Sequence, residues 1–264
     1  MNDFSKSYLK MLVSRQDIAG MNIINYLSEN LQNEVITVVE DCIYSDEEIE
    51  NYVPKNSTII FLSRHSARSL RPSFTVHPIG NFGKAEFGGN DGTLVQCNSL
   101  ILKKLLLNIK ELIESDKFNL LYSYEISVEA THHGPFSKFP IAFIEVGSSE
   151  PQWRDLEACR LIAEVLNNFD IGEINQNNEW VSAVGFGGNH YANKFTKLIL
   201  ESENAIGHIC AKYAIPLLND KLVEQMITNT IPRPKIAFFN KKSMKRKQEI
   251  RKMLLDYNIE VIQV

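Results

Sequence analysis

The chain has 264 residues, of which 44% are hydrophobic and 23% are charged, and its formal net charge is −4. This composition is typical of a globular protein, and the length suffices to bury a substantial core. No apolar run reaches the roughly 18 residues of a membrane-spanning helix, and residues 1–10 lack the apolar stretch of a signal peptide, so we expect no membrane partner.

Strand-like and helix-like segments alternate along the chain. Short apolar runs predict strands at residues 8–14, 34–39, 58–63, 121–129, 141–146, 180–184, 235–239 and 259–264. Helical spacing or helix-start signals predict helices at residues 17–29, from Ser45 onward, and at 99–113, 151–167, 220–228 and 243–257, while 195–200 fits either state. This alternation predicts an α/β fold with a largely parallel or mixed sheet. No linker signal divides the chain, so we predict a single domain over residues 1–264.

The helix predicted at residues 99–113 differs from the others because it is apolar on nearly every side. A helix of that kind must be covered all round, which places it at the centre of the fold. The four cysteines, Cys42, Cys97, Cys159 and Cys210, are far apart and form no CxxC motif. We interpret them as reduced, mostly buried thiols of a cytoplasmic protein.

Positive charge is concentrated near the end of the chain. Residues 233–252 hold nine Lys or Arg and one acid, a local charge of +8 that leaves −12 on the remaining chain. Such asymmetry can mark a phosphate-contacting surface on an acidic protein. The alternative is a helix face that is merely solvated.

Histidines occur where predicted strands give way to loops rich in Gly, Pro or Ser. The segments are Ser63-Arg-His-Ser66, Thr75-Val-His77, Thr131-His-His-Gly-Pro135 and Gly185-Phe-Gly-Gly-Asn-His190. Because sites in open α/β sheets form at the carboxyl ends of strands, we expect these histidines to converge at one edge of the sheet. Structural or surface roles are the alternative for any single histidine.

His132 and His133 are neighbours, and neighbours in a regular strand point to opposite faces. We therefore expect one to face the site and the other to hydrogen-bond structure, unless Gly134 and Pro135 bend the chain. Glu129 and Glu145 are possible carboxylate partners. His and carboxylate ligands suit zinc, although no HExxH or CxxC spacing is present.

Taken together, these segments resemble the archaeal and plant-type D-aminoacyl-tRNA deacylases. The resemblance runs from about residue 8 to residue 231 and includes Glu145-Val-Gly-Ser-Ser-Glu150 and the Gly-Gly-Asn-His-Tyr segment that ends at Tyr191. One departure is Asn193, where the family usually has proline after His-Tyr-Ala. The resemblance implies a three-layer α/β/α fold with a central mixed sheet, similar to the phosphorylase/hydrolase group. It also implies zinc-dependent hydrolysis of the ester between a D-amino acid and the tRNA 3′ end, in a cytoplasmic monomer.

On that basis we assign expected roles to individual residues. His132, His133, Glu145 and His190 are the candidates for zinc ligation and for activating water. Gly187 and Gly188 could stabilise an oxyanion through backbone N–H groups, and the remaining candidates for binding the terminal nucleotide are Arg64, His65, His77 and Tyr191. Phe136 or Phe186 could form the wall that excludes L side chains.

Three other functions remain open on the sequence alone. A zinc-dependent amidohydrolase or peptidase acting on a small molecule would predict tightly bound metal and no affinity for tRNA. A non-catalytic RNA-binding module would bind tRNA without turnover. A phosphorylase-like enzyme would need a phosphate cradle, and none is convincing here.

Overall fold

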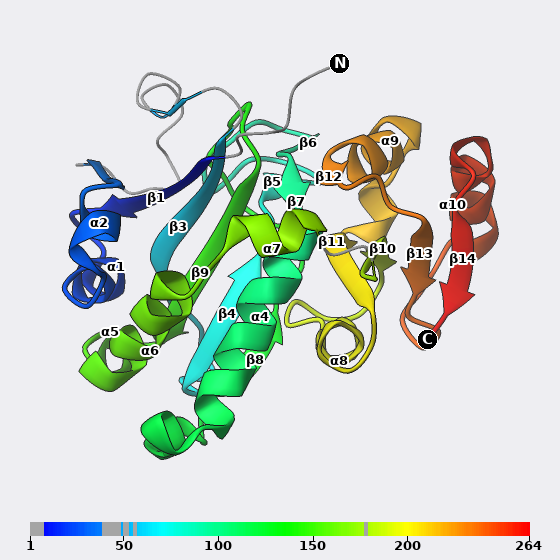
Figure 1. Cartoon of the computed structure of the whole chain (residues 1–264). Helices are drawn as coiled ribbons and strands as arrows, with labels where there is room; N and C mark the ends of the chain where they lie inside the picture. Colours follow the sequence, from blue (N-terminus) through cyan, green and yellow to red (C-terminus); the bar gives the residue numbers. More distant parts are fainter. Residues whose placement is uncertain (1–7, 39–48, 50–52, 55–56, 177–178) are drawn as a thin grey trace.

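The structure is a computed structural model that describes residues 8–38, 49, 53–54, 57–176 and 179–264. Its larger sheet has six strands in the order β2-β1-β3-β9-β4-β8 (Figure 1). These strands are β1 (Tyr8–Ser14), β2 (Val35–Val38), β3 (Ser57–Ser66), β4 (Ser73–His77), β8 (Glu125–Val128) and β9 (Ile141–Ser148). Strand β4 is antiparallel to β9, whereas all other neighbours in this sheet are parallel. The sheet is therefore mixed, and with its flanking helices it confirms the predicted α/β class.

A second sheet, which the sequence did not predict, lies beside the first (Figure 1). It is wholly parallel in the order β11-β10-β13-β14, formed by β10 (Val181–Phe186), β11 (Asn204–Cys210), β13 (Ile236–Phe239) and β14 (Glu260–Gln263). Two short pairs complete the strands: β5 (Gly80–Asn81) with β6 (Thr93–Leu94), and β7 (Cys97–Asn98) with β12 (Thr230–Ile231).

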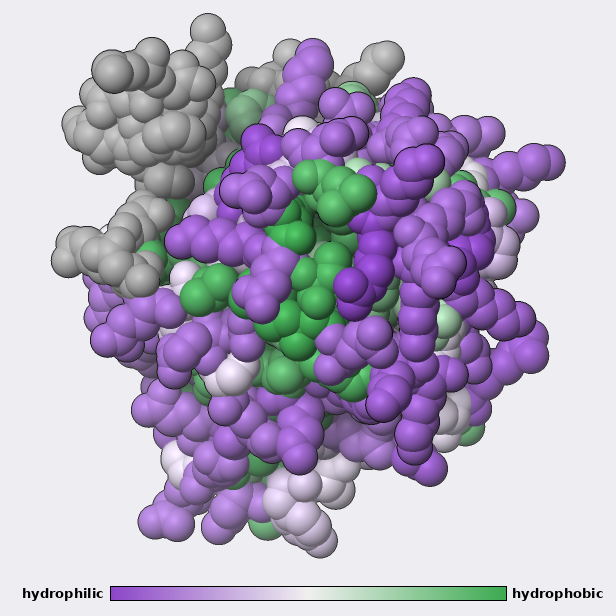
Figure 2. All heavy atoms as spheres, turned by 90° about the vertical axis from the view of Figure 1, so that its right-hand side faces the viewer, coloured by the Kyte–Doolittle hydropathy of each residue, from purple (hydrophilic) through white to green (hydrophobic). Residues whose placement is uncertain are grey.

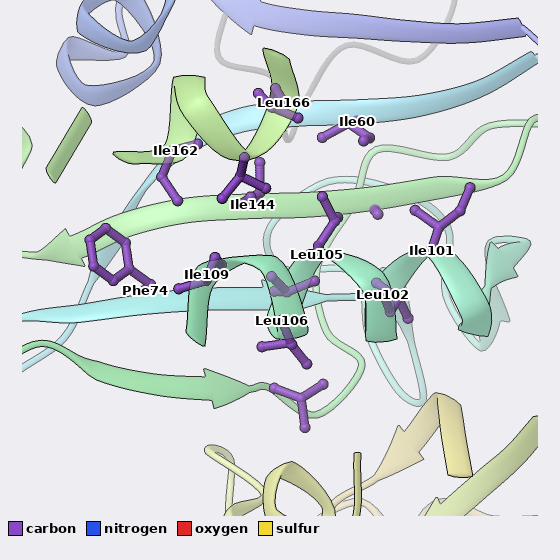
Figure 3. Close-up of a cluster of buried hydrophobic side chains, with 14 of the residues drawn as sticks. Ile60, Phe74, Ile101, Leu102, Leu105, Leu106, Ile109, Ile144, Ile162 and Leu166 are labelled. Atoms are coloured by element: carbon purple, nitrogen blue, oxygen red, sulfur yellow. The ribbon is translucent and has the colours of Figure 1, made fainter. Parts of the chain in front are cut away.

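The central helix α4 (Ser99–Glu114) packs against strands of both sheets, as its all-round apolar sequence predicts. The Asn98 side chain begins the helix by accepting hydrogen bonds from the backbone N–H groups of Leu100 and Ile101. Its apolar side chains and those of α6 (Leu156–Asn167) point onto Ile60, Phe74 and Ile144 of the larger sheet (Figure 3). Each such side chain contributes about 1.5–3 kcal/mol on full burial. Because α4 also packs against β10 and β11 of the second sheet, it joins the two sheets through one hydrophobic cluster.

The larger sheet places its polar site residues on the face away from α4 and α6. Along β3, Ile60 and Leu62 pack into the helix-covered cluster, while Ile59 and Phe61 pack into a separate cluster on the other face. Because side chains alternate between faces, His65 shares the face of Phe61. The same alternation puts Glu145 of β9 and Thr75 and His77 of β4 on that face, with Thr75 paired to Glu145 in register.

The remaining helices largely follow the predicted positions. They are α1 (Ile18–Ile24), α2 (Glu29–Gln32), α5 (Glu150–Trp153), α7 (Ile171–Gln176), α8 (Asn193–Glu201), α9 (Asp220–Thr228) and α10 (Lys247–Leu254), with short 3-10 turns at Asp116–Leu121, Ile215–Leu217 and Leu255–Tyr257. None of the helices among the described residues is long and apolar enough to cross a membrane. The described cysteines, Cys97, Cys159 and Cys210, are buried free thiols, as predicted.

Several predicted boundaries were wrong for local reasons. The helix predicted at residues 151–167 is broken between α5 and α6, because the Asp155 side chain caps a new helix by accepting from the N–H groups of Glu157 and Ala158. The strand predicted at 121–129 begins only at Glu125, after a 3-10 turn. The helix start predicted at Ser45 lies outside the described residues. Strands β4 and β11 were missed.

Candidate active site

The site lies over the face of the larger sheet that carries His65, His77 and Glu145, where loops from both sheets meet. The loop after β8 carries Glu129, His132 and His133, and the loop after β10 carries His190. These loops are joined by a hydrogen bond from the Ala130 N–H to the His190 carbonyl, at 2.8 Å. The histidines thus converge as predicted, but over a face of the sheet rather than at its edge.

Four imidazole rings form one contiguous cluster around His132. Its ring centroid lies 4.4 Å from that of His77, 4.4 Å from that of His133 and 4.5 Å from that of His190. The expectation that only one of the neighbours His132 and His133 faces the site was wrong. They lie in a loop rather than a strand, and His133 has a φ of 46°, which turns both rings to the same side.

Two buried glutamates face the rings of this cluster and the neighbouring ring of His65. Glu145 accepts a hydrogen bond from the Thr75 hydroxyl at 2.8 Å, and its oxygens lie 3.3 Å from His65 Nδ1 and 3.6 Å from His77 Nε2. Glu129 lies 3.3 Å from the same His65 Nδ1. Both carboxyl side chains are almost or wholly inaccessible to solvent, so their charges must be balanced by these rings.

Glu129 also faces two further rings. Its Oε2 lies 3.8 Å from His132 Nε2 and 3.7 Å from His190 Nε2, and neither of its oxygens has a hydrogen-bond partner. From the sequence, Glu129 was expected only to be a possible carboxylate partner, not a ligand or a catalytic residue. The sequence feature that could have identified Glu129 as a site residue is its position directly after a strand and three residues before His132.

The hydrogen bonds of the rings fix which nitrogen faces the cluster. The Nδ1 atoms of His77, His132 and His133 lie 3.2, 2.8 and 2.6 Å from the carbonyl oxygens of Pro78, Ala130 and Gly134. A carbonyl can only accept, so each Nδ1 carries a proton and each neutral ring presents a bare Nε2 inward. A bare Nε2 facing a carboxylate oxygen is unfavourable unless a proton or a cation lies between them.

Within the part of the chain that the structure describes, three groups of side chains could hold a metal ion. They are His77 with His132 and His133, Glu129 with His132 and His190, and His65 with Glu129 and Glu145. The backbone carbonyls that orient the histidines are the outer partners usual for ligating imidazoles. Of the predicted ligands, His132, His133 and His190 belong to the first two groups, whereas Glu145 belongs to the third.

The rings differ in charge state. Burial and the neighbouring His77 lower the pKa of His133 to about 3, and burial with three neighbouring rings holds the pKa of His132 well below its usual value. Burial also opposes charge on His65 and His77, but the carboxylates of Glu145 and Glu129 outweigh it and raise the pKa of both. The same two rings overcome burial and hold the pKa of Glu145 well below its ordinary value.

A cavity of about 720 Å³ opens above the cluster. His132, His133, His190, His65 and Glu145 line its floor, while Phe87, Tyr213 and Leu217 stand at its rim with exposed fractions of 60%, 56% and 51%. The Tyr213 hydroxyl lies 3.1 Å from His190 Nδ1. Tyr213 thereby links the rim to the floor.

The other predicted binding residues lie in different surroundings. Arg64 lines the cavity, and its side chain donates to the Gln16 carbonyl. His65 Nε2 lies 3.2 Å from the Tyr191 hydroxyl, so Tyr191 supports a ring of the floor. His77 is fully buried within the ring cluster; it has no surface on which to bind a nucleotide.

The oxyanion role expected for Gly187 and Gly188 is not supported. The Gly187 N–H donates to the Cys210 carbonyl and the Gly188 N–H donates to the Ser243 hydroxyl, so neither is free to stabilise an oxyanion. Their positive φ angles of 92° and 83° serve a tight turn instead. Of the two residues expected to form the wall that excludes L side chains, Phe186 is fully buried in the core of the second sheet and does not reach the cavity. Phe136 is half-buried against the apolar cluster on the site face of the larger sheet.

The substitution of Asn193 for the usual proline leaves the adjoining helix intact. Asn193 is the first residue of α8, a position that proline favours but does not require. Ala192 before it is in the left-handed region, with a φ of 42°, and its carbonyl accepts from the Phe195 N–H. The chain therefore makes the turn after Tyr191 without proline.

The chain is similar to several known proteins over most of its length. A curated D-aminoacyl-tRNA deacylase of Staphylothermus marinus is 38% identical over 220 residues, covering 83% of this chain and 77% of that protein. The deacylase of Pyrococcus horikoshii is 35% identical over 243 residues, covering 82% and 85%. A crystal structure described as that of a conserved protein of unknown function superimposes with a TM-score of 0.85 at 28% identity, over 97% of this chain and 95% of the other. The sequence profile for D-aminoacyl-tRNA deacylase matches residues 52–262, and the chain belongs to that family.

Proposed function

We propose that this chain hydrolyses the ester that joins a D-amino acid to the 3′ end of tRNA, releasing free D-amino acid and tRNA. The family match over residues 52–262 carries the proposal, together with a cavity floored by histidines and a glutamate. Such a reaction would remove D-amino acids before translation uses them, and we propose that the enzyme acts as a monomer in the cytoplasm, where translation takes place. The relatives give no support to a small-molecule amidohydrolase or peptidase.

We further propose that zinc binds between Glu129, His132 and His190. The support is chemical: the facing Oε2 and Nε2 atoms lie 3.7–3.8 Å apart, and the buried Glu129 oxygens have no hydrogen-bond donor. Zinc takes these ligands at about 2.0–2.2 Å, so ligand atoms in a tetrahedral site are roughly 3.3–3.5 Å apart. Bound zinc would supply Lewis acidity and lower the pKa of water to about 7.

The remaining side chains then have distinct tasks. His65, whose pKa the neighbouring Glu145 and Glu129 raise, would bring positive charge to the cavity floor, where negative charge develops on the ester carbonyl. His133 stays neutral because its pKa is about 3, so it closes the floor without repelling a cation. Tyr213 orients His190 through Nδ1 and leaves Nε2 directed at Glu129.

The rim offers a surface for the end of the tRNA. Phe87 and Tyr213 are aromatic and more than half exposed beside the cavity. Unstacked bases bind exposed aromatic rings with about 1–3 kcal/mol per base, whatever their sequence. The terminal adenosine would stack at this rim while the aminoacyl ester reaches the floor.

The function is tested by measuring release of D-tyrosine from D-Tyr-tRNA beside L-tyrosine from L-Tyr-tRNA, with zinc supplied. We expect release from the D substrate alone. No release from either substrate would overturn the proposed reaction, and equal release from both would overturn its chirality.

The zinc site is tested by the metal content of purified protein, read by mass spectrometry. Glu129→Gln should lose zinc because it removes the only anionic ligand, whereas Glu125→Gln, an exposed glutamate on β8, should retain it. Cobalt substitution gives a second measurement, since a tetrahedral site should show visible absorption in wild type and not in Glu129→Gln. Full zinc occupancy in Glu129→Gln would exclude this ligand set.

A further inference from the structure

The basic residues near the end of the chain do not form one uniform surface. Among residues 233–252, Arg246 pairs with Glu249, and Arg233 and Arg251 lie over the rings of Tyr257 and Phe239. Residues 241–245, the turn that precedes α10, contain Lys241, Lys242 and Lys245, all exposed, and no acid. We name residues 241–245 the basic turn.

The basic turn is attached directly to the walls of the active-site cavity. Its Met244 is buried in the same apolar cluster as Phe82 and Ala214, which line the cavity. Its Ser243 hydroxyl accepts the N–H of Gly188 at 2.6 Å, in the loop that carries His190. The turn is therefore anchored to the loop that carries His190.

Arg246 makes a second connection at the end of the turn. Its guanidinium donates to the carbonyl oxygens of Ile215, Pro216 and Leu218, at 2.9, 3.2 and 3.0 Å. These residues surround Leu217 on the cavity rim. Arg246 thus links the cavity rim to the basic turn. Because its guanidinium already binds these carbonyl oxygens and Glu249, we do not count Arg246 among the cations offered to a partner.

Two further exposed lysines lie near the site. Lys84 lines the cavity together with the exposed Glu86, and the N–H of Lys212 donates to the carbonyl of Gly188, the residue that is joined to the basic turn through Ser243. Figure 2 shows the face at the β14 and α10 end of the molecule, where hydrophilic side chains surround a narrow hydrophobic strip. The exposed lysines of the basic turn add positive charge at this end of the molecule.

We propose that the basic turn binds the phosphate backbone of the tRNA acceptor stem while the 3′ end occupies the cavity. The inference rests on the proposed deacylase function, because an ester at the cavity floor forces the adjoining RNA out across the rim. Lysines on a rigid turn beside that rim meet the first paired phosphates without needing to read sequence. The solvated α10 face, with Lys252, contributes little.

The test measures binding of uncharged tRNA, which needs no turnover. The triple variant Lys241→Gln, Lys242→Gln, Lys245→Gln is compared with a control triple, Lys110→Gln, Lys117→Gln, Lys197→Gln. The control removes the same charge from exposed ion pairs elsewhere, each worth under about 1 kcal/mol. Affinity is measured by fluorescence anisotropy between 50 and 200 mM salt.

Loss of three phosphate contacts lowers the slope of log affinity against log salt by about 2.7. From 50 to 200 mM salt, the control should therefore lose roughly 40-fold more affinity than the basic-turn variant. Equal affinities and slopes in the two triples would overturn the proposal. Hydrolysis of D-tyrosyl adenosine, which has no acceptor stem, separates the stem-binding proposal from the proposed deacylase function. The two triple variants should hydrolyse it at equal rates. If the wild-type protein does not hydrolyse it, the deacylase function is contradicted rather than the stem-binding proposal.

Discussion

Replacement of Glu145 by glutamine should destabilise the metal-free protein by about 3–5 kcal/mol. The carboxylate accepts from Thr75 and faces His65 and His77, whose pKa values it raises. Glutamine keeps the shape and the Thr75 hydrogen bond but removes the charge. His77 is then buried without its counter-charge, and removal of one partner from a buried pair typically costs this amount.

The assay is urea unfolding in the presence of a chelator. With a urea dependence of roughly 3 kcal/mol per molar for a chain of this size, the midpoint should fall by about 1–1.7 M. The matched control is Glu150→Gln, whose carboxylate pairs with Arg154 on the exposed surface of α5 and should shift stability by under about 0.5 kcal/mol.

The pH dependence has a defined sign. The pKa of Glu145 is depressed in the folded state, so its contribution is present above the usual value of 4.5 and is lost as pH falls toward the folded pKa. The pKa values of His65 and His77 are raised, so their contribution is present below 6.5 and is lost as pH rises through their folded values. The difference between wild type and Glu145→Gln should therefore be largest between pH 4.5 and 6.5. A difference no larger than that of Glu150→Gln, or one independent of pH, would refute this account.

Three further changes probe the site. Tyr213→Phe removes the hydrogen bond to His190 and should weaken zinc binding about 10-fold, read by competition with a chelating dye; unchanged affinity would deny Tyr213 an orienting role. Phe87→Ala should raise KM for D-Tyr-tRNA by about 5- to 150-fold with kcat nearly constant, since an exposed ring that stacks a base contributes about 1–3 kcal/mol; a fall in kcat alone would contradict stacking. Gly147→Ala places a Cβ 2.5 Å from His65 Cβ and should cost about 1–3 kcal/mol in thermal unfolding as well as activity; a variant as stable as wild type would show that β3 and β9 separate easily.

Local patterns in the sequence were sufficient for much of the fold. Strand β1 and helix α9 begin and end at the predicted residues, and α4 ends one residue later than predicted. Each depends on periodicity and capping groups within its own segment, such as Asn98 before α4. The clustered histidine motifs also identified the family, because the order of short motifs along a chain needs no knowledge of folding.

The tertiary structure alone decided how the site is assembled. Strand β4 inserts antiparallel beside β9, and this pairing, rather than any local signal in five residues, places His77 and Thr75 against Glu145. The pairing of Glu129 with His190 joins loops from two different sheets. Periodicity reports how a segment relates to its own neighbours. The charge partners of a buried side chain are set by which distant segments pack together, and the sequence does not state that packing.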